Sequence, residues 1–178
     1  MKFFAGLILL MSVSSFPELL ELVISGKETA RPQTGAKQTV TVINNAFVSR
    51  TFENDLVYSK IRAKYKEIPL KKEVIANIHW PEIKDTLLSF QTSQDTFRFY
   101  RAQDKIIPHY ISLGSSKITL DKNLQVGTPA EILKAKFKLK SIPNKLVVQE
   151  LEGGLVFSFK QNREKTKIAR IIFESELD

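Results

Sequence analysis

The residue types that most often carry catalysis are scarce in this chain. Its 178 residues include no cysteine and two histidines, His79 and His109. Without cysteine, a nucleophile would have to be a serine or threonine, and the base that activates it is usually histidine. Neither histidine stands in a Gly-x-Ser-x-Gly frame or another recognised catalytic pattern. The sequence therefore predicts no catalytic residue and a protein that is not an enzyme, with a hydrolase built on one histidine as the weaker alternative.

No segment has the residue pattern of a metal or phosphate site. Asp121, Asn123 and Gln125 alternate as at the start of a calcium loop. However, Lys122 interrupts them, and the required glycine and final glutamate are missing. The two histidines lack the spacing of a zinc motif. Gly127 lacks the further glycines and the lysine of a phosphate-binding loop. We expect no metal and no cofactor.

The first residues have the layout of a secretory signal. Lys2 gives a short positive region, residues 3–11 are apolar, and residues 12–15 offer small side chains for cleavage. A transmembrane anchor needs about 20 uninterrupted apolar residues, and Pro17 and Glu18 interrupt this run sooner. A buried N-terminal helix is a further alternative. We expect residues 1–15 to be a cleaved signal peptide, and the protein to be exported to the periplasm or the extracellular space and soluble there.

The segment after the signal is expected to be a linker or disordered, over residues 16–37. Its second half is polar and contains glycine and proline without an apolar period. The absence of cysteine excludes disulfides and a lipid anchor on cysteine. The folded part of the protein must therefore be held together by its core alone.

Basic residues are the remaining chemical signal. The chain has 27 Lys and Arg against 19 Asp and Glu, a net charge of +8. Many of these cations lie in residues 60–72, 134–145 and 160–170. Solvated lysines that maintain solubility are one explanation, and an anionic partner is the other. For an exported protein this partner would be a protein or an anionic envelope component, not nucleic acid, and any membrane contact would be peripheral.

Alternating apolar and polar residues predict most of the secondary structure as strands. These runs are separated by glycine, proline and polar turns, and they cover residues 39–43, 86–91, 96–101, 105–113, 117–120, 146–151, 155–160 and 167–173. A helix is predicted from Pro129, with Thr128 as its N-cap and Glu131 closing a capping box. Residues 57–66 fit both a strand, by alternation, and a helix, by the capping residues before them.

Two blocks of the sequence are similar to each other. Residues 61–66 (IRAKYK) are echoed by residues 133–138 (LKAKFK), and an aromatic pair followed by an isoleucine-rich run comes after each block. Two lysine-rich hairpin segments can also look alike by composition. If the repeat is genuine, the fold is α+β with two tandem units, residues 38–115 and 116–178. Each unit would have a helix and a three- to four-stranded antiparallel sheet, and the two sheets could be continuous.

The aromatic pairs, Phe97/Phe99 and Phe157/Phe159, are expected to point into the core. Their neighbours, including Ser158, would then face outward and line the open face of the sheet. Residues of this face and of the lysine-rich helix end are the candidate partner-binding residues: Arg98, Tyr100, Lys160, Lys134 and Lys138.

Part of the second half resembles a known exported family. Residues 124–133 (LQVGTPAEIL), 155–159 (LVFSF) and 168–173 (IARIIF) are similar to the β-lactamase-inhibitor-protein-like fold and to the small lipoprotein subunit of the outer-membrane barrel-assembly machine. In the inhibitor protein, tandem units form a concave sheet that grips its partner. The resemblance implies an envelope location and binding in place of catalysis, without supplying a site.

The sequence thus predicts an exported, non-enzymatic binding or scaffold protein whose partner and oligomeric state are open. The alternative is an envelope-surface protein that binds anionic lipid or polysaccharide through its lysine-rich segments. A steep loss of affinity with salt would mark such binding. A binding face on the sheet, in turn, requires that the protein's own helices leave the outward side of the Phe97 and Phe157 strands uncovered.

Overall fold

The computed structural model describes residues 38–176 with the exception of residues 78 and 104. These residues belong to a compact unit that runs from Ala36 to Asp178. They form eight strands and three short helices, in the order β1 (Thr39–Ile43), α1 (Asn45–Asn54), α2 (Tyr58–Lys64), β2 (Lys71–Ala76), β3 (Lys84–Gln91), β4 (Thr96–Arg101), β5 (Ile106–Leu113), α3 (Ala130–Lys136), β6 (Lys145–Gln149), β7 (Leu155–Gln161) and β8 (Ile168–Ser175).

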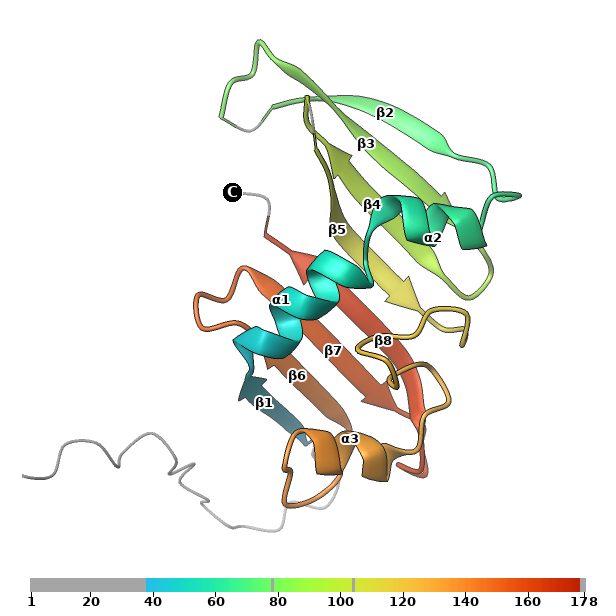
Figure 1. The fold of residues 1–178 in the computed structure, drawn as a ribbon, viewed down its shortest axis with the longest axis vertical. Helices are drawn as coiled ribbons and strands as arrows, with labels where there is room; N and C mark the ends of the chain where they lie inside the picture. Colours follow the sequence, from blue (N-terminus) through green and yellow to red (C-terminus); the bar gives the residue numbers. More distant parts are fainter. Residues whose placement is uncertain (1–37, 78, 104, 177–178) are drawn as a thin grey trace, which may run out of the picture. The chain divides into compact units, whose positions relative to one another are not determined.

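All eight strands form one mixed sheet, in the order β1-β6-β7-β8-β5-β4-β3-β2 (Figure 1). Strands β2 to β5 and β6 to β8 are two antiparallel meanders, which β5 and β8 join by antiparallel pairing. Strand β1 pairs with β6 in parallel and forms one edge of the sheet, and β2 forms the other. The predicted strand at 39–43 is confirmed, and most of the other predicted strands are confirmed with shifted ends.

One face of the sheet carries the core. Phe97, Phe99, Phe157 and Phe159 are fully buried there, as the alternation of apolar residues predicts. The helices pack on this same face. Phe47 of α1 contacts Phe157, with ring centroids 5.4 Å apart. Tyr65, at the end of α2, contacts Phe97 at 4.8 Å, and Phe137, at the end of α3, contacts Phe159 at 6.1 Å.

The prediction of two tandem helix-plus-sheet units is wrong. The structure has one large mixed sheet in which the two halves of the chain are interleaved. The N-terminal helix α1 lies over strands of the C-terminal half, since Phe47 contacts both Phe157 and Phe159. Strand β1 likewise extends the C-terminal meander through β6. The physical reason is that the apolar face of β6 to β8 must be buried. Helix α3 has seven residues, which are too few to cover this face without α1.

The segment at 57–66, which fitted both helix and strand, is the helix α2 (Tyr58–Lys64). Its side chains at Ile61 and Tyr65 are buried, which is the spacing of one helical face. The sequence patterns missed α1 and β2 altogether. The strand predicted at 117–120 is wrong, because this segment pairs with no strand and only Leu120 takes part in an isolated bridge, to Leu124.

The capping box predicted at the start of α3 is also wrong. The N-cap position belongs to Pro129, without a side-chain cap. The Thr128 hydroxyl is used elsewhere: it accepts from the Gln125 N–H at 3.0 Å and donates to the Asn123 carbonyl at 3.3 Å. Thr128 therefore closes the turn that precedes the helix, and Glu131 makes an ion pair with Lys134.

In the part of the chain that the structure describes, no helix combines the length and apolar character needed to cross a membrane. The signal peptide expected at 1–15 and the linker expected at 16–37 lie outside the described residues.

Candidate functional site

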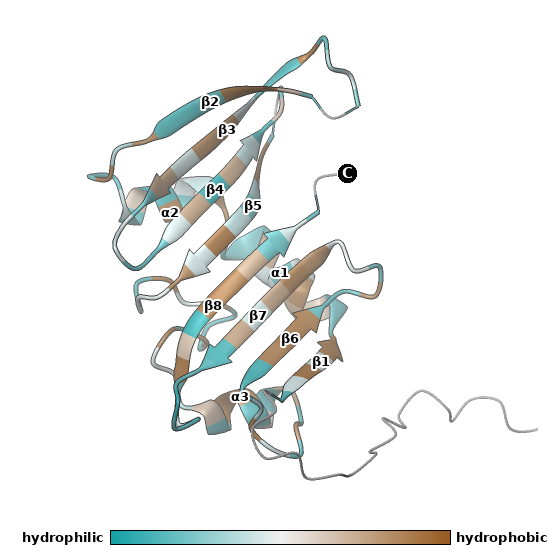
Figure 2. Ribbon diagram, turned by 180° about the vertical axis from the view of Figure 1, so that it is seen from behind, coloured by the Kyte–Doolittle hydropathy of each residue, from teal (hydrophilic) through white to brown (hydrophobic). Residues whose placement is uncertain are grey.

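The candidate site is the sheet face that lies opposite the helices, here called the open face. Figure 2 shows the sheet from this side, with hydrophilic and hydrophobic residues interspersed on the strands. Among the described residues, the helix contacts fall on the Phe97 and Phe157 side, and the open face carries the alternate positions. The condition for a binding face on the sheet is therefore met within residues 38–176.

Three cations lie directly opposite one another across the open face, in a set here called the basic row. Lys145 of β6 is the cross-strand partner of Lys160 on β7, and Lys160 is the partner of Arg170 on β8. Directly opposite residues have Cβ atoms about 4.5–5.5 Å apart, and like charges at such positions destabilise a sheet. None of the three makes an ion pair within the described residues. Repulsion within the basic row therefore lowers the stability of the folded protein.

The guanidinium of Arg170 is held in place from two sides. Its Nη1 donates to the Ser112 hydroxyl at 2.8 Å. Gly114 leaves room for it, because a Cβ at this position would lie 3.2 Å from Arg170 Nη2 and only 2.7 Å from the backbone carbonyl oxygen of Gln94. A larger residue than glycine would therefore push on both the turn and the arginine.

Apolar residues adjoin the basic row, and an aromatic residue lies further along the open face, where Tyr110 is opposite Glu174 of β8. Val147 and Ile172 are half-buried and flank Ser158 on the neighbouring strands. Tyr110 of β5 is half-buried opposite Arg98, whose guanidinium carbon lies 5.6 Å from the ring centroid. A cation on an aromatic face beside half-exposed aliphatic side chains is a combination typical of protein interfaces.

The buried carboxylate of Asp95 links the turn between β3 and β4 to the segment that follows β5. Asp95 accepts hydrogen bonds from the Tyr65 hydroxyl at 2.8 Å, the Gly114 N–H at 2.8 Å, and the Ser115 N–H and hydroxyl at 2.9 and 2.6 Å. Burial alone would raise the pKa of Asp95, but these hydrogen bonds outweigh it and lower the pKa below its ordinary 3.8. Burial, together with Asp95, raises the pKa of Tyr65 to about 12. Asp95 thereby ties α2 to the turn beside Arg170.

The predicted partner-binding residues do not form one site. Arg98 and Lys160 are exposed on the open face, as expected. Lys134 and Lys138 belong to α3 and its end, which pack against the opposite face through Phe137. Lys134 makes an ion pair with Glu131 at 3.6 Å.

Tyr100 and Ser158 were expected to be exposed, and this is wrong. Tyr100 is 8% exposed and Ser158 is 3% exposed. The Tyr100 hydroxyl donates to Asp85, and Asn77 Nδ2 donates to Asp85 at 2.6 Å and to Tyr100 at 3.3 Å. The hydrogen bond to Asp85, together with burial, raises the pKa of Tyr100. This residue therefore closes a small polar cluster at the far end of the sheet.

The two histidines belong to different elements: His79 lies in the connection between β2 and β3, and His109 lies in β5. The His79 N–H donates to Asn77 Oδ1, and its ring contacts Trp80 with centroids 5.9 Å apart. His109 lies beside the β-bulge of β5, with a buried Nδ1 that has no hydrogen-bond partner. Neither ring is hydrogen-bonded to a hydroxyl or a carboxylate in residues 38–176. The same residues contain no group of three metal-ligating side chains.

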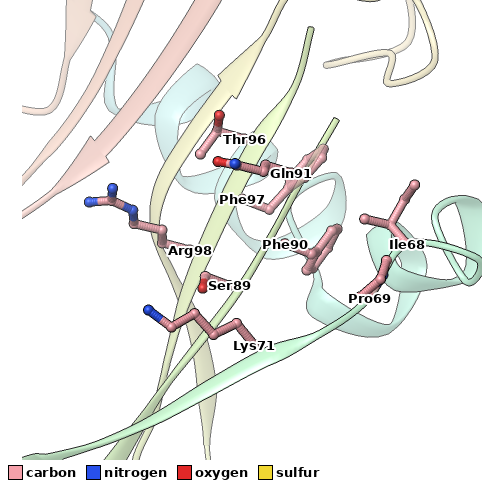
Figure 3. Close-up of a pocket in the computed structure, with 9 residues that line it drawn as sticks. All are labelled: Ile68, Pro69, Lys71, Ser89, Phe90, Gln91, Thr96, Phe97 and Arg98. Carbon is pink, nitrogen blue, oxygen red and sulfur yellow. The ribbon is translucent and has the colours of Figure 1, made fainter. Parts of the chain in front are cut away.

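A cavity of about 440 Å³ lies where β2 begins to pair with β3. Figure 3 shows Lys71, Ser89 and Arg98 on one side of it and Phe90, Phe97 and Ile68 on the other. Its lining has cations, amides, hydroxyls and aromatic rings but no carboxylate and no histidine. Through Arg98 the cavity adjoins the open face.

Comparison with protein families, curated proteins and solved structures finds no match to this chain. The residues of the open face are therefore the features that indicate a function. Lys145, Arg170 and Tyr110 are the members that the sequence patterns missed. The signal for Lys145 was present, since a hairpin centred near Gly153 aligns it with Lys160.

Proposed function

We propose that this protein is an exported binding module whose open face binds an acidic surface of a partner protein. The observation that carries the proposal is the basic row, in which Lys145, Lys160 and Arg170 are cross-strand neighbours without acidic partners among the described residues. Such a row lowers the stability of the free protein, and an acidic partner would relieve the repulsion on binding.

The composition of the open face supports a protein partner. The half-buried Val147, Ile172 and Tyr110 provide apolar and aromatic contact area beside the charges. Interfaces between proteins combine such a core with charged groups at the rim, where complementary charge speeds encounter and sets orientation. The resemblance to a family whose sheet grips a partner supports this use of the sheet, and the signal-like pattern of residues 1–15 is the basis for proposing export.

The distribution of lysines favours a protein over a membrane surface or a polysaccharide layer. Binding to a planar anionic layer would be strongest with the lysine-rich segments on one side of the molecule. Instead, Lys160 is on the open face, whereas Lys134 and Lys138 lie with α3 on the helix side. A flat anionic surface could therefore not contact the basic row and the lysines of α3 at the same time.

The test compares charge reversals on the two faces. Poly-L-glutamate serves as an acidic polypeptide probe in calorimetric titrations, and Lys160→Glu is compared with the matched variant Lys138→Glu. We expect Lys160→Glu to weaken binding about tenfold and Lys138→Glu less than twofold, with affinity falling steeply as salt rises from about 50 to 200 mM. Equal losses in both variants, or tighter binding to vesicles of anionic phospholipid than to poly-L-glutamate, would overturn the proposal.

A further inference from the structure

The two edges of the sheet differ in how they are protected. Free strand edges invite pairing with other chains, and proteins usually block them with charges, prolines or bulges. The β2 edge carries Lys71, Lys72 and Glu73 within its six residues. The β1 edge has the sequence TVTVI, with no charge and no proline, and Ile43 is 55% exposed. No described strand pairs with the outer side of β1.

The hydrogen bonds to β6 show which backbone groups of β1 are free. The Gln38 carbonyl accepts from the Lys145 N–H at 3.3 Å, and the Asn44 N–H donates to the Gln149 carbonyl at 2.9 Å. In a parallel pair, alternate residues of a strand direct both backbone groups to the neighbour. The residues that bond β6 are thus the even-numbered ones. Thr39, Thr41 and Ile43 direct their N–H and C=O groups outward.

We propose that two copies of this chain pair through β1 as an antiparallel dimer, with the two-fold axis at Thr41. Thr41 then lies opposite Thr41 of the second copy, and Thr39 lies opposite Ile43. These are the residues with outward backbone groups, so this register makes them hydrogen-bonded pairs. A two-fold dimer uses the same patch on both subunits.

The side chains fit this register as well. Val40 lies opposite Val42 of the second copy, and both valines belong to the helix face, where they pack against the core. Pairs of β-branched residues are favourable across strands. The sequence TVTVI is nearly a palindrome about Thr41, which makes the edge complementary to itself. The dimer would extend the sheet and place both open faces on the same side.

The dimer is expected to be weak, since a five-residue edge buries less than the interfaces of stable complexes. Sedimentation equilibrium of the protein purified from expression of the full chain, from about 1 µM to 1 mM, should show reversible dimerisation. Amide exchange at Thr39, Thr41 and Ile43 should slow as the concentration rises, because these N–H groups become hydrogen-bonded.

Substitutions in β1 and in β2 test whether the dimer forms through β1. Thr41→Lys places like charges opposite each other at the axis and should weaken dimerisation at least tenfold. Thr41→Val keeps the β-branched shape and should preserve the dimer. Val74→Lys, at an exposed position of the β2 edge, is the matched control and should change nothing. Thermal melts establish that each variant is folded.

A monomer at all concentrations would overturn the proposal, and would leave an extended peptide of another protein as the occupant of the edge. Equal dimerisation of wild type and Thr41→Lys, or disruption by Val74→Lys, would also overturn it. Binding of Thr41→Lys to poly-L-glutamate is measured in parallel. Because Thr41→Lys adds a cation opposite Val147 on the open face, its binding should be at least as tight as that of the wild type, so that failure of the dimer is distinguishable from failure of the open face.

Discussion

Neutralising the centre of the basic row should stabilise the protein while it weakens binding. Lys160 is the residue to change, because it has a cation directly opposite on both sides, Lys145 and Arg170. Lys160→Gln keeps a polar, flexible side chain that is one atom shorter and removes the charge. The matched control is Lys72→Gln, because Lys72 is also an exposed strand lysine but lies opposite Leu88.

The size of the effect follows from the charge separations. If the side chains hold their charges about 7 Å apart, each repulsion is about 0.6 kcal/mol in water before screening. At 0.15 M salt, screening reduces this to about 0.25 kcal/mol for each pair, or about 0.5 kcal/mol for both. At 0.01 M salt the sum is about 1 kcal/mol, and at 1 M salt it is close to zero.

Urea denaturation at these three salt concentrations measures the difference directly. We expect Lys160→Gln to raise the free energy of unfolding by about 1, 0.5 and 0 kcal/mol as salt rises, beyond any change in Lys72→Gln. The control removes the general benefit of lowering the net charge of +8. A Lys160→Gln variant that is no more stable than the control at 0.01 M salt would refute the reasoning that the row is repulsive.

Three further predictions concern the residues that hold the structure around the two faces. Asp95→Asn should lower the free energy of unfolding by about 1–3 kcal/mol, because buried donors lose their charged acceptor. Since the folded state holds the pKa of Asp95 below 3.8, its contribution should be complete above about pH 5 and lost as pH falls below about 4. Urea titrations across pH should show this acid loss in the wild type and a smaller one in the variant; identical profiles would contradict the role of Asp95. Gly114→Ala should cost about 1–3 kcal/mol in the same assay, because its Cβ would lie 2.7 Å from the Gln94 carbonyl, and an unchanged midpoint would show that this turn is not constrained. Lys138 has a left-handed backbone, with φ of 52°, which glycine adopts without strain. Lys138→Gly should therefore raise the free energy of unfolding by about 0.5–1 kcal/mol without weakening poly-L-glutamate binding. A less stable variant would contradict this.

The part of the fold that alternation encodes could be predicted from the sequence. Phe97, Phe99, Phe157 and Phe159 alternate with polar residues, and this pattern placed them in the core. Strand β2 has a charged first half because it is a sheet edge, so it lacks the alternation that marks a strand. Helix α1 mixes its apolar residues with Asn, Ser, Arg, Thr and Glu, and its clearest local signal is Asn44, whose side chain accepts from the Phe47 N–H at 3.0 Å.

The arrangement of the two halves could not be predicted, because it depends on contacts that are distant in the chain. Nothing in the local sequence of β1 says that it pairs with β6, about a hundred residues away. The apparent repeat suggested that each half covers its own strands. Instead, α1 crosses to the C-terminal strands, where Phe47 completes an aromatic cluster with Phe137 and Phe159.

The candidate site was predictable only in part, for a related reason. Arg98 and Lys160 follow from the outward positions of strands, and both are exposed. Tyr100 has an outward position too, but a tyrosine beside a buried Asp85 becomes covered once its hydroxyl has a partner. The basic row required the register of two hairpins at once, and a shift of one residue would have moved Arg170 to the other face.

The most direct test of the open face as the binding site is an NMR titration. The ¹⁵N-labelled protein is titrated with poly-L-glutamate at about 0.05 M salt, and amide shifts are followed along the strands and α3. We predict that the largest changes occur around Lys145, Lys160 and Arg170, with those of α3 near zero. Changes of equal size around Lys134 and Lys138 would contradict the central claim.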